Sequence, residues 1–263
     1  MNNDLVISSA QNPRIKRLLA LQQKPAMRRK EGLTVVEGQR ELQHCLDAGF
    51  EVETLFRCQS MNSDTIVADI DAPMVEVTRD VYARIAYRGG TEGIIAIVRP
   101  RLLTLDELNL GDKPLLIVLE SVEKPGNLGA VLRSADAAAA TAVIVCDPLT
   151  DLYNPNVIRS SIGAIFTVPC VACDTTSCIN FLKRNRIAIL TAQLQDSSPY
   201  YDTDMTRATA LVMGTEATGL TDAWRQAADA HIRIPMNGAL DSLNVSVSAA
   251  ILLFEAVRQR NSL

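Results

Sequence analysis

The chain has 263 residues, 48% of them hydrophobic and 21% charged, with a formal net charge of −4 at pH 7. This length favours two domains, and the composition is that of a globular protein with a core, not of a wholly basic nucleic-acid binder. No stretch approaches the roughly 18 consecutive apolar residues of a membrane span, and the amino terminus lacks the basic and then apolar order of a signal peptide.

The amino end is basic although the whole chain is acidic. Residues 1–44 carry eight Lys and Arg side chains against four Asp and Glu side chains. This asymmetry is typical of a segment that contacts a polyanion. A solvated amphipathic helix explains it equally well, because apolar residues recur on one side of 13–23. The candidates for contact with such a polyanion are Arg14, Lys16, Arg28 and Arg29.

Short alternating elements continue to about residue 100. Strands are expected at 33–37, 53–57, 66–70 and 93–98, with helices at 38–48 and 80–86. They form a small α/β module. The predicted boundaries are 1–103 for this domain, 104–113 for a polar linker and 114–263 for a second domain.

The second domain begins with a near-continuous apolar run at 115–119, as in a strand that is covered on both faces. A loop at 120–129, a helix at 130–140 and a strand at 142–146 complete a βαβ unit. Further helices are expected at 157–166, 178–184 and 244–259, and further strands near 168 and at 187–194, 210–213 and 232–234. Neither G-x-G-x-x-G nor G-x-x-x-x-G-K-[ST] occurs, which disfavours a dinucleotide fold and a P-loop.

Two glycine-bearing loops follow strands of this domain, at 214–219 and 235–242. Ligands of open α/β sheets bind where the carboxyl ends of parallel strands turn into helices. Glycine lets the backbone approach a ligand closely. The two loops therefore predict one ligand pocket.

Three motifs occur in order in the second domain. The first contains Asn127, Gly129, Arg133 and Ala135; the second contains Gly214, Glu216, Gly219 and Leu220; the third contains Ile234, Pro235, Met236, Ser242, Leu243, Asn244 and Ser246. Together they resemble the SpoU/TrmH family of RNA ribose 2′-O-methyltransferases in the SPOUT superfamily. The amino end, at 12–38, resembles the L30e-like substrate-binding domain of the same family.

The resemblance implies a trefoil-knotted α/β domain with a mostly parallel sheet, joined to the smaller L30e-like α/β domain. It also implies S-adenosylmethionine as methyl donor, and a homodimer whose active site lies at the subunit interface. Ribosomal RNA is favoured as substrate, because relatives that modify transfer RNA often lack an L30e-like extension.

Site residues are implied in the same way. Asn127, Arg133 and Glu216 are the catalytic candidates, and Arg133 is assigned to the phosphate and the developing alkoxide because arginine stays protonated. Arg159 and Ser246 are further candidates for substrate binding. The candidates for cofactor binding are Gly214, Gly219, Leu220, Ile234, Met236, Ser242, Leu243 and Asn244.

Other readings remain open at this point. The chain is alternatively a non-catalytic RNA-binding or ribosome-assembly protein on the same fold, a methyltransferase for transfer RNA, or a nucleotide-dependent α/β enzyme. Six cysteines without an export signal indicate reduced thiols in a cytoplasm. Cys170, Cys173 and Cys178 are not followed by a histidine or fourth thiol at zinc spacing, so no metal site is expected.

Overall fold

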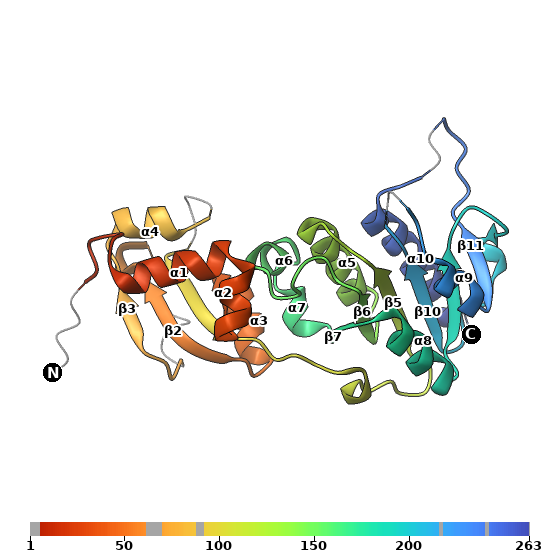
Figure 1. Cartoon of the computed structure of the whole chain (residues 1–263), viewed down its shortest axis with the longest axis horizontal. Coiled ribbons are helices and arrows are strands. Elements are labelled where there is room, and N and C mark those ends of the chain that lie inside the picture. The colour runs from red at the N-terminus through yellow and green to blue at the C-terminus, as the bar shows by residue number, and fades with distance from the viewer. Residues whose placement is uncertain (1–5, 62–69, 88–91, 216–217, 240–241, 263) are drawn as a thin grey trace. The chain divides into compact units, whose positions relative to one another are not determined.

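The computed structural model describes residues 6–61, 70–87, 92–215, 218–239 and 242–262 (Figure 1). Its residue contacts divide the chain into two compact units. The first unit comprises Met1–Arg101 and Tyr153–Thr167, and the second comprises Leu102–Leu152 and Val168–Leu263. Within the described ranges, no helix is both long and apolar enough to cross a bilayer.

The first unit is built on a small mixed sheet with strand order β1-β4-β2-β3. Its strands are β1 (Thr34–Glu37), β2 (Glu51–Arg57), β3 (Met74–Glu76) and β4 (Ile94–Arg99); β3 lies parallel to β2, and the other pairs are antiparallel. In Met1–Arg101 its helices are α1 (Pro13–Gln23), α2 (Pro25–Glu31), α3 (Gln39–Asp47) and α4 (Arg79–Ile85), with a 3-10 turn at Gln59–Met61. The buried side of α1, formed by Ile15, Leu18 and Leu21, packs into this core. The predicted small α/β module is confirmed.

The second unit contains a seven-stranded, entirely parallel sheet with order β7-β6-β5-β10-β8-β11-β9. Its strands are β5 (Leu115–Glu120), β6 (Ala142–Cys146), β7 (Cys170–Cys173), β8 (Ala188–Ala192), β9 (Ser198–Pro199), β10 (Thr209–Met213) and β11 (Ala230–Arg233). Every residue of β5, β6 and β10 is buried. This burial explains their uninterrupted apolar runs, and the sheet confirms the predicted fold class.

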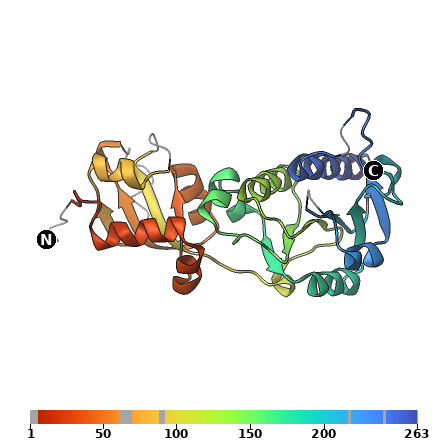
Figure 2. The ribbon, with the colours of Figure 1, turned by 45° about the horizontal axis from the view of Figure 1, so that its top comes forward.

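Helices cover both faces of this sheet (Figure 2). The helices α5 (Pro125–Ala137) and α10 (Val245–Asn261) pack side by side on one face. The helices α8 (Thr175–Arg184) and α9 (Asp222–Ala227) lie on the other face, against a core that includes Trp224. Two 3-10 turns, Leu105–Glu107 and Tyr200–Asp202, lie in the connections.

Two predicted helices differ from the observed ones. The helix expected at 130–140 begins at Pro125, so Asn127 lies in its first turn and not in a loop. Proline suits a first turn because its missing N–H would have no partner there. The helix expected at 157–166 is two helices, α6 (Pro155–Ser160) and α7 (Ala164–Thr167), separated by positive φ angles at Ile162 and Gly163. The strand predicted at 66–70 falls almost wholly outside the described residues.

The segment Tyr153–Thr167 belongs by its contacts to the first unit, although the sequence-based boundaries put it in the second domain. Aromatic rings provide one reason, since Phe50 lies 5.8 Å from Tyr153 and 5.1 Å from Phe166, measured between ring centroids. An ion pair provides another, because Arg159 Nη2 lies 3.6 Å from Glu37 Oε2. The second unit is therefore built from two stretches of chain.

Candidate functional site

A pocket of about 350 Å³ opens at the carboxyl ends of three strands of the second unit. These strands, β10, β8 and β11, are neighbours in the sheet. The pocket is lined by Ala192, Gln193, Leu194, Gln195, Met213, Gly214, Thr215, Thr218, Gly219, Leu220, Arg225, Ile232, Arg233, Ile234, Met236, Ser242, Leu243, Val245 and Ser248. Residues from both glycine-bearing loops thus meet at one pocket.

Most residues predicted to bind the cofactor lie in this lining. Seven of them contribute to it: Gly214, Gly219, Leu220, Ile234, Met236, Ser242 and Leu243. The eighth, Asn244, follows directly and forms the N-cap of α10. Glu216 lies outside the described residues, so the structure assigns it no position.

The loop after β10 requires glycine at its first position. A Cβ atom on Gly214 would lie within 2.5 Å of backbone atoms of Gly219 and Leu220, far inside van der Waals contact. Gly219 has φ +68° and its N–H donates to the carbonyl of Thr215 at 3.0 Å. The Thr218 N–H donates to the Thr215 hydroxyl at 3.0 Å. The described part of this loop therefore folds tightly, with backbone facing the pocket.

The pocket has apolar walls and a few polar groups. Met213, Leu220, Ile232, Ile234 and Leu243 supply apolar surface. A pocket of this size and composition suits a small molecule that has an apolar part and a few polar groups.

The polar groups of the pocket include two buried atoms, Gln193 Oε1 and Arg225 Nε, that have no hydrogen-bond partner within the described part of the chain. Another nitrogen of the same guanidinium, Arg225 Nη1, donates to Gln195 Oε1 at 3.4 Å. Sequence reasoning missed these three residues. The two glutamines carried a usable signal, because Gln193 is next to the last residue of the strand predicted at 187–194 and Gln195 directly follows it, at the edge where ligands bind.

The first and third motifs meet where α5 and α10 begin. The side-chain amide of Asn244 donates to Asn127 Oδ1 at 3.2 Å. Asn244 Oδ1 in turn accepts from the Ser246 N–H at 3.0 Å and from the Ser246 hydroxyl at 2.6 Å. These bonds fix Asn127 beside Asn244, the residue that directly follows Leu243 in the pocket wall. Ser246 donates to the N-cap residue of α10 and so helps to fix the start of that helix.

Arg133 is exposed on α5, six residues beyond Asn127. At about 100° and 1.5 Å per residue, the two side chains leave the helix roughly 120° apart and 9 Å apart along its axis. Neither residue lines the pocket formed by the described part of the chain. One chain thus brings the predicted cofactor residues together, whereas Arg133 is not among the described residues that line their pocket.

The candidates for substrate binding in the first unit fall into two groups. Arg14, Lys16 and Arg29 are exposed on α1 and α2. Arg28 is buried, and its guanidinium donates to the carbonyls of Leu21 at 2.8 Å and Gln22 at 3.1 Å. It ties α2 to the end of α1, so we withdraw it from the RNA-binding set.

Arg159 is also engaged within the first unit. Its guanidinium pairs with Glu37, lies 3.5 Å above the centre of the Tyr87 ring and donates to Asn156 Oδ1 at 2.8 Å. These contacts hold α6 against the sheet of that unit. Arg159 therefore has a structural role in the first unit, which the motif did not indicate.

Family models match both parts of the chain. Residues 114–254 match the SpoU rRNA Methylase family, and residues 12–96 match the MRM3-like substrate binding domain. Among curated relatives, the 23S rRNA (guanosine-2'-O-)-methyltransferase RlmB of Vibrio vulnificus is 37% identical over 73% of this chain and 80% of its own length.

Solved structures with the same fold extend over nearly all of the chain. The crystal structure of an RNA 2'-O ribose methyltransferase has 38% identity and a TM-score of 0.86, covering 98% of this chain and 100% of the other. The SpoU methyltransferase AviRb of Streptomyces viridochromogenes, in complex with AdoMet, has 28% identity and a TM-score of 0.89, covering 96% and 100%. The chain therefore belongs to the SpoU rRNA methylase family.

Proposed function

We propose that this chain transfers the methyl group of S-adenosylmethionine to a ribose 2′-hydroxyl of ribosomal RNA, with 23S rRNA as the first candidate. The observation that carries the proposal is the pocket at the ends of β8, β10 and β11, which gathers the second and third motifs. The relative RlmB of Vibrio vulnificus is a 23S rRNA (guanosine-2'-O-)-methyltransferase, which supports this choice of substrate. A ribosomal RNA substrate is consistent with a protein that acts in the cytoplasm.

The pocket has the chemistry that S-adenosylmethionine requires. When bound, this cofactor supplies an electrophilic methyl group on a positively charged sulfur. Apolar side chains such as Leu220, Ile234 and Leu243 provide contacts for the adenine ring. Gln193 Oε1 can accept a hydrogen bond from the amino group, and Arg225 Nε can donate one to the carboxylate. Both atoms would gain partners that the described residues do not give them.

The catalytic residues act on the RNA side of the reaction. Arg133 binds the phosphate next to the reacting ribose and stabilises the oxygen as it loses its proton, because a guanidinium remains charged. Asn127, held by Asn244, orients the ribose at the mouth of the pocket. Glu216, from the second motif, remains a sequence-based prediction for the same site.

A second copy of the chain completes this site. Arg133 does not line the pocket that the described residues of its own chain form, so we assign the arginine at that pocket to a partner chain. The helix α10 offers a surface for that partner, because Val247 and Phe254 are 46% and 48% exposed, and Ile251 lies between them. These residues occupy positions i, i+4 and i+7 on one side of the helix. We include the homodimer and the trefoil knot of the family in the proposal.

The first unit supplies contacts to the RNA backbone. Arg14, Lys16 and Arg29 project from neighbouring helices, and all three are exposed. The match of residues 12–96 to a substrate binding domain supports this assignment. Binding through phosphates weakens as salt is added.

The test is transfer of a radioactive methyl group from S-adenosylmethionine to purified RNA by the full chain. We expect label in 23S rRNA that lacks the modification, and much less in 16S rRNA or transfer RNA. Absence of transfer to every RNA by a folded protein that binds the cofactor would support the non-catalytic alternative. Label mainly in transfer RNA would correct the substrate.

The shared site has its own test, in which Gly214→Ala and Arg133→Ala chains are mixed and allowed to exchange. In a mixed dimer, one site combines an intact pocket with an intact arginine from the other chain. We therefore expect mixing to restore activity that neither variant has alone. Lack of restoration, with exchange demonstrated, would contradict a site shared between chains.

A further inference from the structure

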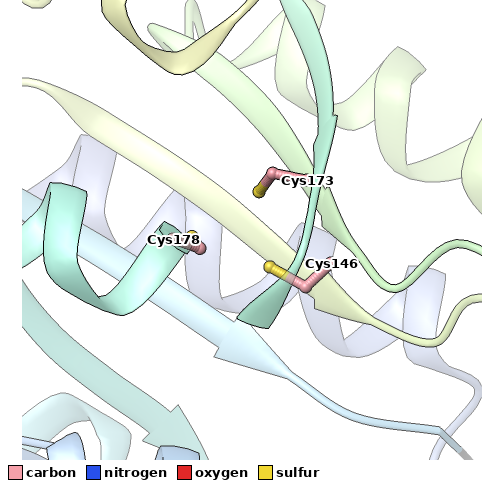
Figure 3. Close-up of side chains that lie close together, drawn as sticks. All are labelled: Cys146, Cys173 and Cys178. Carbon is pink, nitrogen blue, oxygen red and sulfur yellow. The ribbon is translucent and has the colours of Figure 1, made fainter. Parts of the chain in front are cut away.

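Three cysteines of the second unit come together although they are distant in the sequence. Cys146 is the last residue of β6, Cys173 is the last residue of β7, and Cys178 lies near the start of α8. Their Sγ atoms all lie within 4.8 Å of one another. Figure 3 shows the sulfur atoms of Cys146 and Cys173 on the side of their strands that faces Cys178. None of them lines the pocket at β8, β10 and β11.

Regular structure holds all three thiols in place. Cys146 and Cys173 are register partners in the parallel pair β6–β7, so their side chains lie on the same face of the sheet. The helix α8 covers that face, and its start is fixed because Asp174 Oδ1 accepts the Ser177 N–H at 2.8 Å. Cys178 follows on this helix and is fully buried. The cluster is therefore a property of the fold and not of a loop.

The spacing of the sulfur atoms suits a shared metal ion. At the usual zinc–sulfur distance of about 2.3 Å, two thiolates on one tetrahedral ion stand roughly 3.8 Å apart, so only small movements are needed. A disulfide would need two sulfurs at about 2.05 Å and would leave the third unused. We propose that Cys146, Cys173 and Cys178 form a three-thiolate site for one thiophilic divalent cation of the zinc class.

The surroundings of the cluster favour a cation. Asp147 and Asp174 directly follow two of the cysteines, are exposed, and add negative charge nearby. Neither is assigned as a ligand, because Asp147 Oδ2 accepts the Thr175 hydroxyl at 2.7 Å and Asp174 caps α8. Cys173 is only half-buried, so water can reach the fourth position of a tetrahedral ion from its side.

This ligand set differs from the one considered in the sequence. Cys170 precedes Cys173 at a spacing typical of zinc ligands but is not part of the cluster, and Cys146 supplies the third thiol instead. The segment Tyr153–Thr167 belongs to the first unit and separates the two stretches of the second unit. An ion at this site would link these two stretches, because Cys146 precedes the segment and Cys173 and Cys178 follow it. It would thereby stabilise the folded second unit, since metal binding contributes to folding free energy.

The test uses the full chain without an affinity tag, reduced, freed of metal and kept under argon. Cd²⁺ is the probe, because thiolate-to-metal charge transfer gives an ultraviolet absorption band. We expect the band to saturate at one ion per chain, Zn²⁺ to displace Cd²⁺, and the thermal midpoint to rise. Cys173→Ala should weaken binding at least about tenfold. The matched control Cys170→Ala, a buried cysteine on the same strand, should bind within about twofold of wild type.

X-ray absorption at the zinc edge identifies the atoms bound to zinc in the wild-type chain and therefore needs no variant that folds. We expect three sulfur atoms at about 2.3 Å from the ion. A shell made only of nitrogen and oxygen, or no saturable binding by the reduced wild type, would overturn the proposal. Unchanged affinity in folded Cys173→Ala would do the same.

Discussion

Replacing Gly214 by alanine tests the loop geometry on which the cofactor pocket depends. The added Cβ would lie 2.2 Å from the carbonyl carbon and oxygen of Gly219 and 2.5 Å from the Leu220 nitrogen. All three are backbone atoms, so relief requires the loop to move by about an ångström. Overpacking of this kind costs about 1–3 kcal/mol. Because a bound cofactor must contact the displaced backbone, we expect its affinity to fall roughly five- to hundredfold.

Calorimetric titration with S-adenosylmethionine measures this loss, and thermal denaturation checks that the variant is folded. The matched control is Gly126→Ala, since a Cβ at Gly126 meets nothing within 4 Å. We expect its cofactor affinity to equal that of the wild type. Binding by folded Gly214→Ala within about twofold of wild type would refute the reasoning, because it would mean that the cofactor does not depend on this loop.

Three more predictions concern arginine and lysine side chains with different surroundings. Arg260 on α10 donates to four backbone carbonyls that precede β5 and β10, so Arg260→Ala should destabilise the chain by about 2–4 kcal/mol in denaturant unfolding; a loss below about 1 kcal/mol would contradict this. Arg133→Ala should bind S-adenosylmethionine normally and lose methyl transfer by roughly a hundredfold or more; near-normal turnover would remove its role. Arg14→Ala and Lys16→Ala should each lower the slope of log RNA affinity against log salt concentration by roughly one phosphate contact. The variant Arg28→Ala should instead mainly reduce thermal stability. Equal slopes in all three variants would argue against RNA contact through α1.

The strands of the second unit were predictable because their environment leaves a direct trace in the sequence. A strand buried on both faces reads as a near-continuous apolar run, and β5, β6 and β10 do so apart from Glu120 at the end of β5 and Thr209 at the start of β10. The helix α1 was equally clear, because Asn12 and Pro13 mark its start and its apolar side recurs at helical spacing.

Pairing and packing between distant segments were not predictable from local pattern. Nothing in the composition of β10 says that it lies between β5 and β8 in the sheet. The sequence predicted a helix of the second domain at 157–166, yet aromatic contacts with Phe50 attach Tyr153–Thr167 to the first unit. The burial of Arg28 was hidden for the same reason, since a basic run does not reveal which member donates to the preceding helix.

The candidate site divides in the same way. Glycines at 214 and 219 could be recognised because backbone geometry restricts the residue type there, and the resemblance supplied their ligand. Gln193 and Arg225 belong to no motif, and their role is indicated by buried atoms that lack a hydrogen-bond partner among the described residues of the pocket. Cys146 joins Cys173 and Cys178 only through strand register.

The position of the transferred methyl group tests the central claim most directly. The full chain is incubated with S-adenosylmethionine and unmodified 23S rRNA, and the RNA is then hydrolysed in alkali and analysed by mass spectrometry. A methyl group on the 2′-oxygen prevents cleavage at that ribose, so we predict one alkali-resistant dinucleotide that carries the added methyl mass. Methylation found only on a base, with every internucleotide bond cleaved, would contradict the proposed reaction.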